Sequence, residues 1–320
     1  MSDAKTGGFF ANLKIGNKII ALTLVFGLVP AGALMGILFN QYEPFHVKLS
    51  ADLGVTARKA IEVVDRNLFE RYGDVQAFGL NSAAVAPYNL GNRDPNNPLI
   101  RAMNGYMTGY GIYKLMVLVD PKGKVLAINT VDGKGEPLKT EALDALYERS
   151  FADEPWLKNA VAEKFLEGSN GLTGTVVEDP RVDPVVESVY GPGQYTMVYA
   201  APVKNAAGIT VGIWANYADF GLVEDIFASF HKEFAEAGQP EAELTMLDRK
   251  GVVLVDYDPV AQGWTQYPRD MKVIGQLNLA EKGVEAAVLA IDGKTGSLTE
   301  SFHARKKINQ VAGYAYTKGG

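Results

Sequence analysis

The sequence predicts an α/β (α+β) protein with one transmembrane helix, a long stalk helix and two tandem modules built on antiparallel sheets, the second of them truncated. Three observations lead to this prediction. An uncharged stretch of 21 residues lies near the N-terminus, a long amphipathic pattern follows it, and one strand–turn–strand layout occurs twice, about 128 residues apart.

The uncharged stretch, residues 19–39, carries a single polar side chain, Thr23. A helix of this length reaches roughly 30 Å, which is the thickness of the hydrocarbon core of a bilayer. Pro30 in its middle is tolerated in membrane helices. Three lysines precede the stretch, whereas residues 40–55 contain only Lys48 as a basic residue. We therefore expect a cytoplasmic N-terminus and an exported remainder.

A cleaved signal peptide is the alternative interpretation of this stretch. Ala31-Gly32-Ala33 resembles a cleavage site, and the basic N-terminus suits a signal peptide. The apolar run is longer than the usual signal core and continues to Phe39, which favours an uncleaved anchor. Both interpretations export everything after Asn40.

The charge and composition of the chain argue against some classes of binding partner. The net charge is −6, and residues 1–18 contribute +2 (three Lys against Asp3), so the exported part carries −8. An acidic exterior argues against binding to nucleic acid or to anionic membranes. The chain has no cysteine, and its three histidines lie far apart in sequence. The sequence therefore predicts no metal site and no cofactor.

The stretch after the membrane segment predicts a long stalk helix over residues 41–80. Its apolar residues recur at steps of three and four, which is typical of an amphipathic helix. Most of this stripe should pack on its own domain, and the membrane-proximal turns, residues 41–64, should pair with a second subunit in a homodimer. The stripe consists of Leu53, Ala57, Ala60, Ile61, Val64, Leu68, Tyr72, Val75 and Phe78.

A module with alternating strands and helices follows the stalk. Period-two runs predict strands, and longer amphipathic runs predict helices. Residues 178–194 contain two Asp-Pro pairs and a Gly-Pro-Gly, and we interpret them as a restrained loop that acts as a lid. The predicted helices are 99–109, 141–150, 154–167 and 220–236, and the predicted strands are 114–119, 124–129, 172–177, 195–203 and 210–217.

The second module repeats the first in outline. An Asp-x-x-Gly turn joins two strands at Asp120–Gly123 and again at Asp248–Gly251, and residues 310–317 echo the strand that begins at Tyr195. The sequence ends at Gly320, soon after that strand. We therefore expect an incomplete second module, and a sequence that is the N-terminal part of a longer protein.

The motif LKIGNKI before the membrane segment, the stalk ending in ERYGDVQAF and the two hairpins together resemble a known family. They are similar to the N-terminal part of methyl-accepting chemotaxis proteins that carry a double Cache (dCache) periplasmic sensor domain. The resemblance implies two PAS-like (Cache) modules, a ligand in the membrane-distal one, a location in the bacterial inner membrane and a receptor that signals across it. It implies a cytoplasmic tail 1–18, a transmembrane helix 19–39, a stalk 40–82, a distal module 83–236 and an incomplete proximal module 237–320.

Members of this family that sense amino acids carry an Arg-x-Trp-Tyr motif and, on a later loop, a Tyr-x-Asp motif. The matching segments here are Asp153–Leu157 and Arg181–Asp183. Trp156 and Asp183 match, whereas Glu154 stands in place of the arginine that holds the ligand carboxylate. Arg181 could supply a charge from another position. The departures favour an amine or another small cation over an α-amino acid.

The residue types of the first module suit such a ligand, because aromatic faces beside carboxylates attract small cations. Many of these rings could equally belong to the core, and many of the acids could be solvated. The aromatic residues are Trp156, Tyr190, Tyr195, Tyr199, Trp214 and Tyr217, and the acids are Glu154, Glu178, Asp179, Asp183 and Glu187. The predicted ligand-binding residues are Trp156, Glu154, Arg181, Asp183, Tyr195, Trp214 and Tyr217. Residues 256–270, with Trp264 and Tyr267, are a second candidate site.

Other functions stay open at this stage. The same sensor precedes histidine kinases and diguanylate cyclases, so these residues do not determine the output. A membrane-anchored envelope enzyme and a purely structural dimerisation module are two further classes. The sequence has no G-x-S-x-G, H-E-x-x-H or P-loop motif, which favours a sensor without enzymatic activity.

Overall fold

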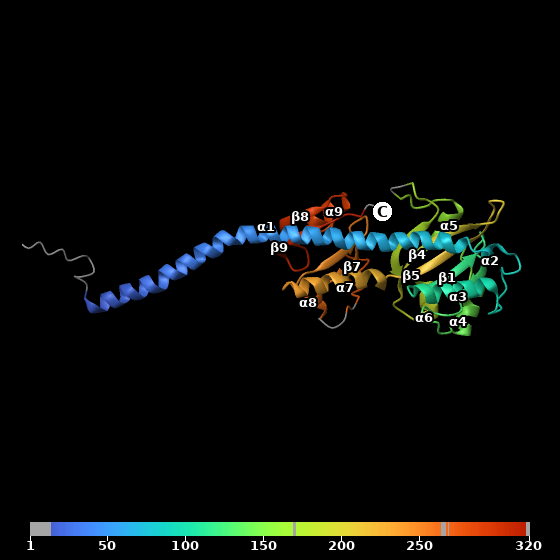
Figure 1. The fold of residues 1–320 in the computed structure, drawn as a ribbon, viewed down its shortest axis with the longest axis horizontal. Helices are drawn as coiled ribbons and strands as arrows, with labels where there is room; N and C mark the ends of the chain where they lie inside the picture. The colour runs from blue at the N-terminus through green and yellow to red at the C-terminus, as the bar shows by residue number, and fades with distance from the viewer. Residues whose placement is uncertain (1–13, 169–170, 264–266, 268, 318–320) are drawn as a thin grey trace, which may run out of the picture.

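One helix connects all parts of the molecule. The computed structural model describes residues 14–168, 171–263, 267 and 269–317. Helix α1 (Ile15–Gly79) has 65 residues and contains Pro30 and Pro44. Figure 1 shows it running alongside both globular parts and extending beyond them as a rod. The predicted membrane segment and the predicted stalk are therefore one uninterrupted helix.

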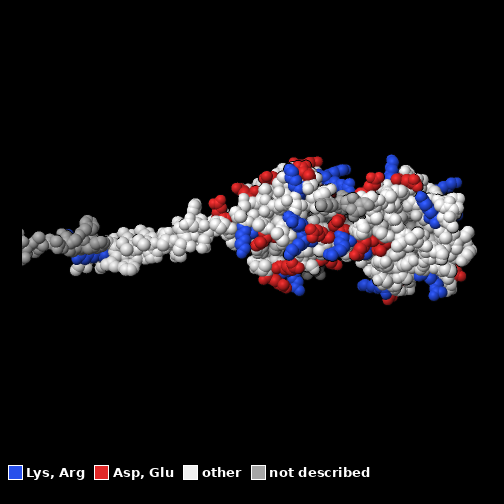
Figure 2. Space-filling view, turned by 45° about the horizontal axis from the view of Figure 1, so that its top comes forward, with Lys and Arg blue, Asp and Glu red and all other residues white. Residues whose placement is uncertain are grey.

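The N-terminal part of α1 is apolar on every side, and its large apolar side chains are exposed from Ile19 to Phe39. No charged residue occurs between Lys18 and Glu43. Figure 2 shows this stretch as an uncharged rod, in contrast to the charged globular parts. By length and composition, this part of α1 is long and apolar enough to cross a membrane.

The first globular part is built on a five-stranded antiparallel sheet in the order β2-β1-β5-β4-β3. Its central strand, β5, pairs with β1 on one edge and with β4 on the other. The strands are β1 (Tyr113–Val119), β2 (Val125–Ile128), β3 (Val176–Val182), β4 (Tyr195–Lys204) and β5 (Thr210–Asp219).

Helices cover both faces of this sheet, because successive side chains of a strand point to opposite faces. Met116 and Leu118 of β1 pack with the end of α1 and with α3 (Pro98–Tyr110), close to the short α2 (Ser82–Val85). Val117 and Val119 pack on the other face. That face is covered by α4 (Thr140–Glu148), α5 (Pro155–Val161) and α6 (Pro184–Tyr190). The sheet therefore lies between two apolar layers.

The second globular part contains two separate two-stranded antiparallel sheets, β6-β7 and β8-β9. Its core joins Val64 of α1 to Phe227 of α7 and Val255 of β7. The elements are α7 (Gly221–Glu236), β6 (Leu244–Leu247), β7 (Val253–Tyr257), α8 (Pro259–Gln262), α9 (Glu285–Ile291), β8 (Gly296–His303) and β9 (Ile308–Tyr314).

The repeated hairpin has the same geometry in both parts. Asp120 Oδ1 accepts hydrogen bonds from the backbone N–H groups of residues 122 and 124, and Asp248 Oδ1 accepts from those of residues 250 and 252. Gly123 and Gly251 have φ values of 86° and 88°, which favour glycine. A later segment of the chain crosses each turn closely. One backbone N–H of that segment donates a hydrogen bond to the carbonyl oxygen of the glycine in the turn. The internal repeat is confirmed at the level of the hairpin.

Helix α1 packs on the β8-β9 sheet at very short range. A Cβ atom on Gly54 would lie 2.9 Å from the carbonyl oxygen of Gly296, and one on Gly313 would lie 2.2 Å from the backbone of Leu53. Only glycine allows this approach. The contact holds the stalk against the second sheet.

Two predicted elements of the first module were wrong in extent. Helix α5 ends at Val161 rather than residue 167, because Glu163 adopts a left-handed conformation with φ 53°. Strand β3 begins at Val176 rather than residue 172, after Gly171 and Gly174 break the extended backbone with positive φ. The remaining strands and helices of the module agree with the prediction to within two residues at each end.

The predicted lid loop at residues 178–194 was also wrong. It contains the second half of β3 and the whole of α6. Asp183 caps this helix by accepting hydrogen bonds from the N–H groups of Val185 and Val186, at 2.9 and 3.4 Å, and Pro184 occupies its first position. Asp at the N-cap followed by Pro is a helix start signal, and here it outweighs the turn tendency of the same pair.

Candidate functional site

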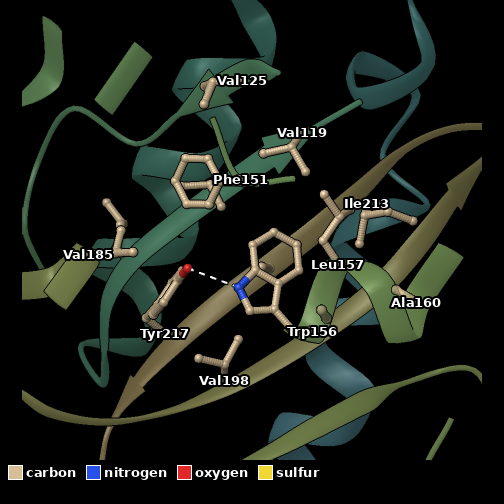
Figure 3. Close-up of a cluster of buried hydrophobic side chains, with 14 of the residues drawn as sticks. Val119, Val125, Phe151, Trp156, Leu157, Ala160, Val185, Val198, Ile213 and Tyr217 are labelled. Atoms are coloured by element: carbon tan, nitrogen blue, oxygen red, sulfur yellow. Dashed lines mark hydrogen bonds between the residues drawn. The ribbon is translucent and has the colours of Figure 1, made fainter. Parts of the chain in front are cut away.

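The face of the sheet that α4, α5 and α6 cover holds two fully buried residues of the predicted site, Trp156 and Tyr217. Trp156 lies near the start of α5, and its indole Nε1 donates a hydrogen bond of 3.2 Å to the hydroxyl oxygen of Tyr217 on β5. Both side chains are 0% exposed. Figure 3 shows the two rings among Phe151, Val185 and Val198. This pair forms the apolar floor of the candidate site.

A cluster of charged side chains adjoins this floor. Arg181 on β3 lies 2.5 Å from Glu178 and 2.9 Å from Asp183, measured between guanidinium nitrogen and carboxylate oxygen. Its Nη2 lies 3.8 Å from Glu154. Arg149 forms a second ion pair with Glu154 at 3.0 Å. We call these five residues the acidic cluster, because its three carboxylates outnumber its two guanidinium groups.

The ends of three elements bring the acidic cluster together. Glu154 is the N-cap residue of α5, and Asp183 is the N-cap residue of α6. Glu178 and Arg181 flank an irregularity in the pairing of β3 with β4, which places both side chains on the same side. Carboxylates at helix N-termini are favoured by the helix dipole, so the fold stabilises negative charge here.

Burial changes the acid–base behaviour of the site. It raises the pKa of the Glu178 carboxyl above its ordinary value, although the hydrogen bond and charge of Arg181 act in the opposite direction. Burial would lower the pKa of Arg181, but the bond to Glu178 and the charges of Glu178 and Asp183 raise it overall. Burial and the neighbouring carboxylates of Asp183 and Glu154 raise the pKa of the Tyr217 hydroxyl. Tyr217 is therefore neutral, and Arg181 is charged.

Two of the predicted site residues lie elsewhere. Trp214 precedes Tyr217 by three residues in the same strand, so the two side chains point to opposite faces of the sheet. Trp214 packs with Phe78 on the α1 side, and its Nε1 donates to Asn216 Oδ1 at 2.8 Å. The prediction that Trp214 joins the other site residues was wrong.

Tyr195 is the other displaced residue. It lies at the start of β4 and belongs to the core of the second part, where its ring meets Phe220 edge-on at 5.3 Å. Its hydroxyl donates to the carbonyl oxygen of Leu254 at 3.3 Å. Tyr195 therefore joins the two globular parts and does not face the acidic cluster. The structure brings together Trp156, Glu154, Arg181, Asp183 and Tyr217.

The other residues considered for the site also have structural contacts. Tyr190 donates its hydroxyl to the carbonyl oxygen of Lys114, and Tyr199 packs on the α1 side of the sheet. Glu187 accepts from the N–H of Gly193. Arg149 was missed as a member of the cluster, although its position five residues before Glu154 places the two groups around one short turn.

The second candidate segment, residues 256–270, forms part of the second core. Tyr267 stacks on Tyr257 at 5.2 Å, and its hydroxyl accepts a bond from the N–H of Asp256. The carboxylate of Asp256 is held by both terminal nitrogens of Arg305, at 2.7 and 2.8 Å. Trp264 lies outside the described residues.

A large cavity of about 1,590 Å³ lies along α1, mostly against the second globular part, and extends to residues of the first such as Val177 and Tyr199. The residues around it include Leu53 and Ile61 of α1, the whole of β6 and most of β9. None of the five gathered site residues borders it. Within the described part of the chain, no group of three or more His, Cys, Asp or Glu side chains is arranged to hold a metal ion.

Comparison with known proteins identifies the fold. No family model and no curated protein sequence matches the chain. The sensory domain of the Campylobacter jejuni chemoreceptor Tlp3 with isoleucine bound is similar in structure, with a TM-score of 0.50 and 13% identity over 83% of this chain and 86% of that one. The Tlp3 ligand-binding domain in complex with L-norvaline has a TM-score of 0.50 and 11% identity, over 84% and 85%. The chain has the fold of the sensory domains of bacterial chemoreceptors.

Proposed function

We propose that this chain is the sensory part of a membrane-anchored chemoreceptor, that it binds a small cationic ligand in its first module, and that it transmits the signal across the membrane through α1. The observation that carries the proposal is the acidic cluster beside the Trp156–Tyr217 pair. The fold supports a function as a sensor, and the acidic cluster supports a cationic ligand.

The acidic cluster can accept hydrogen bonds from one more positively charged group. Its three carboxylates face two guanidinium groups, so the net charge is −1. The Glu178 side chain is 10% exposed, and its Oε1 is buried without a hydrogen-bond partner among the described residues. A buried carboxylate oxygen without a donor is costly. A ligand ammonium group, which has three donors, would satisfy it.

The side chain of Arg181 controls access to the carboxylates of this site. Its side chain is 35% exposed, whereas Glu154, Glu178 and Asp183 are 14% exposed or less. A ligand ammonium could replace the guanidinium group between these carboxylates, and Arg181 would then turn into solvent. Such an exchange alters the packing of α5 and α6 only in the bound state, and it thereby gives the ligand different affinities for two conformations.

Calorimetry on the full chain in detergent tests the site, with amines, amino acids and organic acids as probes. We expect an amine to bind, and Asp183→Asn to abolish its binding while the asparagine still caps α6. Asp183→Ala should abolish binding and also destabilise the fold. Tyr199→Phe, a buried tyrosine on the opposite face, should bind as the parent does. Unchanged binding in the Asn variant would remove the ligand from this cluster.

Binding to the variant Arg181→Gln would distinguish an amine ligand from an amino-acid ligand. If the ligand ammonium competes with Arg181, the variant binds the amine more tightly, because the carboxylates lose their internal partner. If Arg181 instead holds the carboxylate of an amino acid, the variant loses binding. Tlp3 was solved with isoleucine, so the second outcome is the specific alternative to the proposal.

The pH dependence of affinity offers an independent check. A bound cation favours the ionised form of Glu178, whose pKa is raised by burial. Binding should therefore release a proton, and affinity should fall as the pH falls through the raised pKa. Titrations in two buffers of different ionisation enthalpy would reveal the proton. Glu178→Gln should bind more weakly and without this pH dependence.

We also propose the topology and division of the chain. The cytoplasmic tail covers residues 1–18, the transmembrane segment 19–39, the stalk 40–82, and the two modules 83–236 and 237–320. The lysines before the anchor support a location in the bacterial inner membrane with the modules in the periplasm. A reporter fused after Asn81 should behave as periplasmic. Cytoplasmic behaviour would contradict the topology.

A further inference from the structure

The ring of His303 in the second module lies between a carboxylate and two backbone donors. His303 is the last residue of β8, and its Nε2 lies 2.7 Å from Glu243 Oε2. Its other ring nitrogen, Nδ1, accepts hydrogen bonds from the backbone N–H groups of Arg305 and Lys306, at 3.2 and 3.1 Å. The side chain is only 9% exposed. Both ring nitrogens are therefore bound by the protein itself.

These contacts determine which ring nitrogen carries the hydrogen. A backbone N–H can only donate, so Nδ1 must offer its lone pair to the two N–H groups and carries no hydrogen. Nε2 then carries the hydrogen and donates it to the Glu243 carboxylate. The ring is neutral in this arrangement. The charged ring, in which both nitrogens are donors, cannot make the two bonds at Nδ1.

The two hydrogen bonds to Nδ1 stabilise the turn between β8 and β9, residues 303–308. The same turn is closed by a bond of 2.8 Å from the N–H of Lys307 to the carbonyl oxygen of His303. Lys307 has a left-handed backbone with φ 55°, which is costly for a residue other than glycine. A proton on Nδ1 would remove the acceptor of two N–H groups from a turn that is already strained.

Charged groups around the ring have the opposite effect, because they attract a proton. Lys306 pairs with Glu243, and its Nζ lies 3.6 Å from Asp258. Arg305 holds both carboxylate oxygens of Asp256, at 2.7 and 2.8 Å. Three carboxylates face two cations, so the net charge of the group is −1 with a neutral ring and 0 with a charged one. The closed turn excludes the proton, and the carboxylates favour it.

We propose that the second module is a proton sensor with His303 as its switch, independent of the ligand site in the first module. At neutral pH the ring is neutral and holds the turn closed. In acid a proton binds to Nδ1, the N–H groups of residues 305 and 306 lose their acceptor, and the turn opens. Imidazole is suited to this role, because its charge changes between about pH 5 and pH 8.

The position of the turn connects this switch to the stalk. Arg305 fastens the turn to β7 through Asp256. The β8-β9 hairpin also packs closely on α1, where Gly313 meets the backbone of Leu53. An open turn would release the hairpin from β7 while the hairpin stays on α1. A change of pH would thus act on the same helix as the first module.

Nitrogen NMR of the histidine side chains, on the full chain in detergent, tests the state of the ring. The chain has three histidines, so substitution of His46 and of His231 assigns the signals of His303 without altering it. We expect a hydrogen on Nε2 alone at about pH 8 and on both nitrogens at about pH 5. A hydrogen on Nδ1 at the higher pH, or a ring that stays neutral at the lower pH, would overturn the proposal.

Amide hydrogen exchange tests the opening of the turn. His303→Asn is the closed reference, because its Oδ1 can accept the same two N–H groups and does not titrate, as Asp183 Oδ1 accepts those of residues 185 and 186. The intrinsic effect of pH on exchange cancels in the ratio of parent to variant. We expect equal rates at about pH 8, and roughly tenfold faster exchange of residues 305–307 in the parent at about pH 5.

His46→Asn is the matched control, because His46 lies in α1 far along the chain from the turn and should leave the response of the parent unchanged. A ratio of parent to His303→Asn that stays constant with pH would overturn the proposal. Loss of the response in His46→Asn would also overturn it, because it would assign the proton to the stalk.

Discussion

Single side chains of the first core offer the simplest test of the packing. Tyr217→Phe removes the oxygen that accepts the bond from Trp156 Nε1 and leaves a buried donor without a partner. We expect the free energy of unfolding to fall by about 1–3 kcal/mol. Tyr199→Phe is the matched control, because among the described residues the hydroxyl of Tyr199 donates only to the sulfur of Met197, and its removal should cost less stability. Denaturant titration of both variants measures the difference.

Glu178 makes stability depend on pH. Burial raises its pKa in the folded state above the ordinary 4.5, so the folded state binds more protons than the unfolded chain between these two values. Its contribution to stability is complete below about pH 4.5 and is lost as the pH rises through the raised pKa. Glu178→Gln, which stays neutral, should therefore gain in melting temperature relative to the parent as the pH rises. A constant difference from pH 4 to pH 8 would contradict this assignment.

At this scale the sequence could have predicted more than it did. The sequence analysis assigns Trp214 and Tyr217 to one binding site as aromatic residues of the first module, although a separation of three within a strand places them on opposite faces. The alternation of side chains along the strand can be read from the sequence. The position of Tyr195 cannot be read in this way, because its hydrogen-bond partner Leu254 lies 59 residues away in the second module.

Among the elements, the contact between α1 and the β8-β9 sheet gives a paired prediction. Gly54→Ala would place a methyl group 2.9 Å from the backbone of Gly296 and should destabilise the protein. Gly73→Ala lies in the same helix, where a Cβ atom meets nothing within 4 Å. It should stabilise the protein by about 0.5–1 kcal/mol, because alanine favours helix. Thermal unfolding of the two variants should thus show shifts of opposite sign, and shifts of the same sign would contradict the close approach.

Element type was predictable where a strong local signal existed. Asp-x-x-Gly fixes both hairpins, and period-two runs identify β1, β4 and β5. Helix α6 was missed because Asp-Pro also starts turns, and its packing against the sheet decided the outcome. Strand β3 was misplaced because Gly171 and Gly174 look no different in sequence from glycines within a strand.

For the whole molecule we predict a homodimer in which α1 pairs with its symmetry mate. The exposed face of the stalk includes Asp52, Val55, Lys59 and Glu62, whereas Ala60 faces the second module. Single cysteines at the four exposed positions should crosslink in membranes, and Ala60→Cys should not. Crosslinking without helical period, or none at any position, would contradict the proposed interface. Because the chain has no native cysteine, every crosslink would come from an introduced residue.

The general architecture was predictable because the anchor, the stalk and the repeated hairpin each leave a periodic pattern in the sequence. The continuity of the anchor with the stalk was less evident. Pro44 lies between the predicted membrane segment and most of the predicted stalk, and α1 passes through it without a break. The loss of one backbone hydrogen bond there was outweighed by the flanking helical turns.

That continuity has a mechanical consequence. A helix of 65 residues is about 98 Å long, so a change of one degree in its tilt moves one end relative to the other by about 1.7 Å. The close glycine contact at Gly54 can act as the fulcrum of this lever, with the first module on one arm and the membrane anchor on the other. The anchor end of α1 at Ile15 lies about 58 Å from this fulcrum and the other end at Gly79 about 38 Å, so a shift of the first module would reach the bilayer enlarged about 1.6-fold and in the opposite direction.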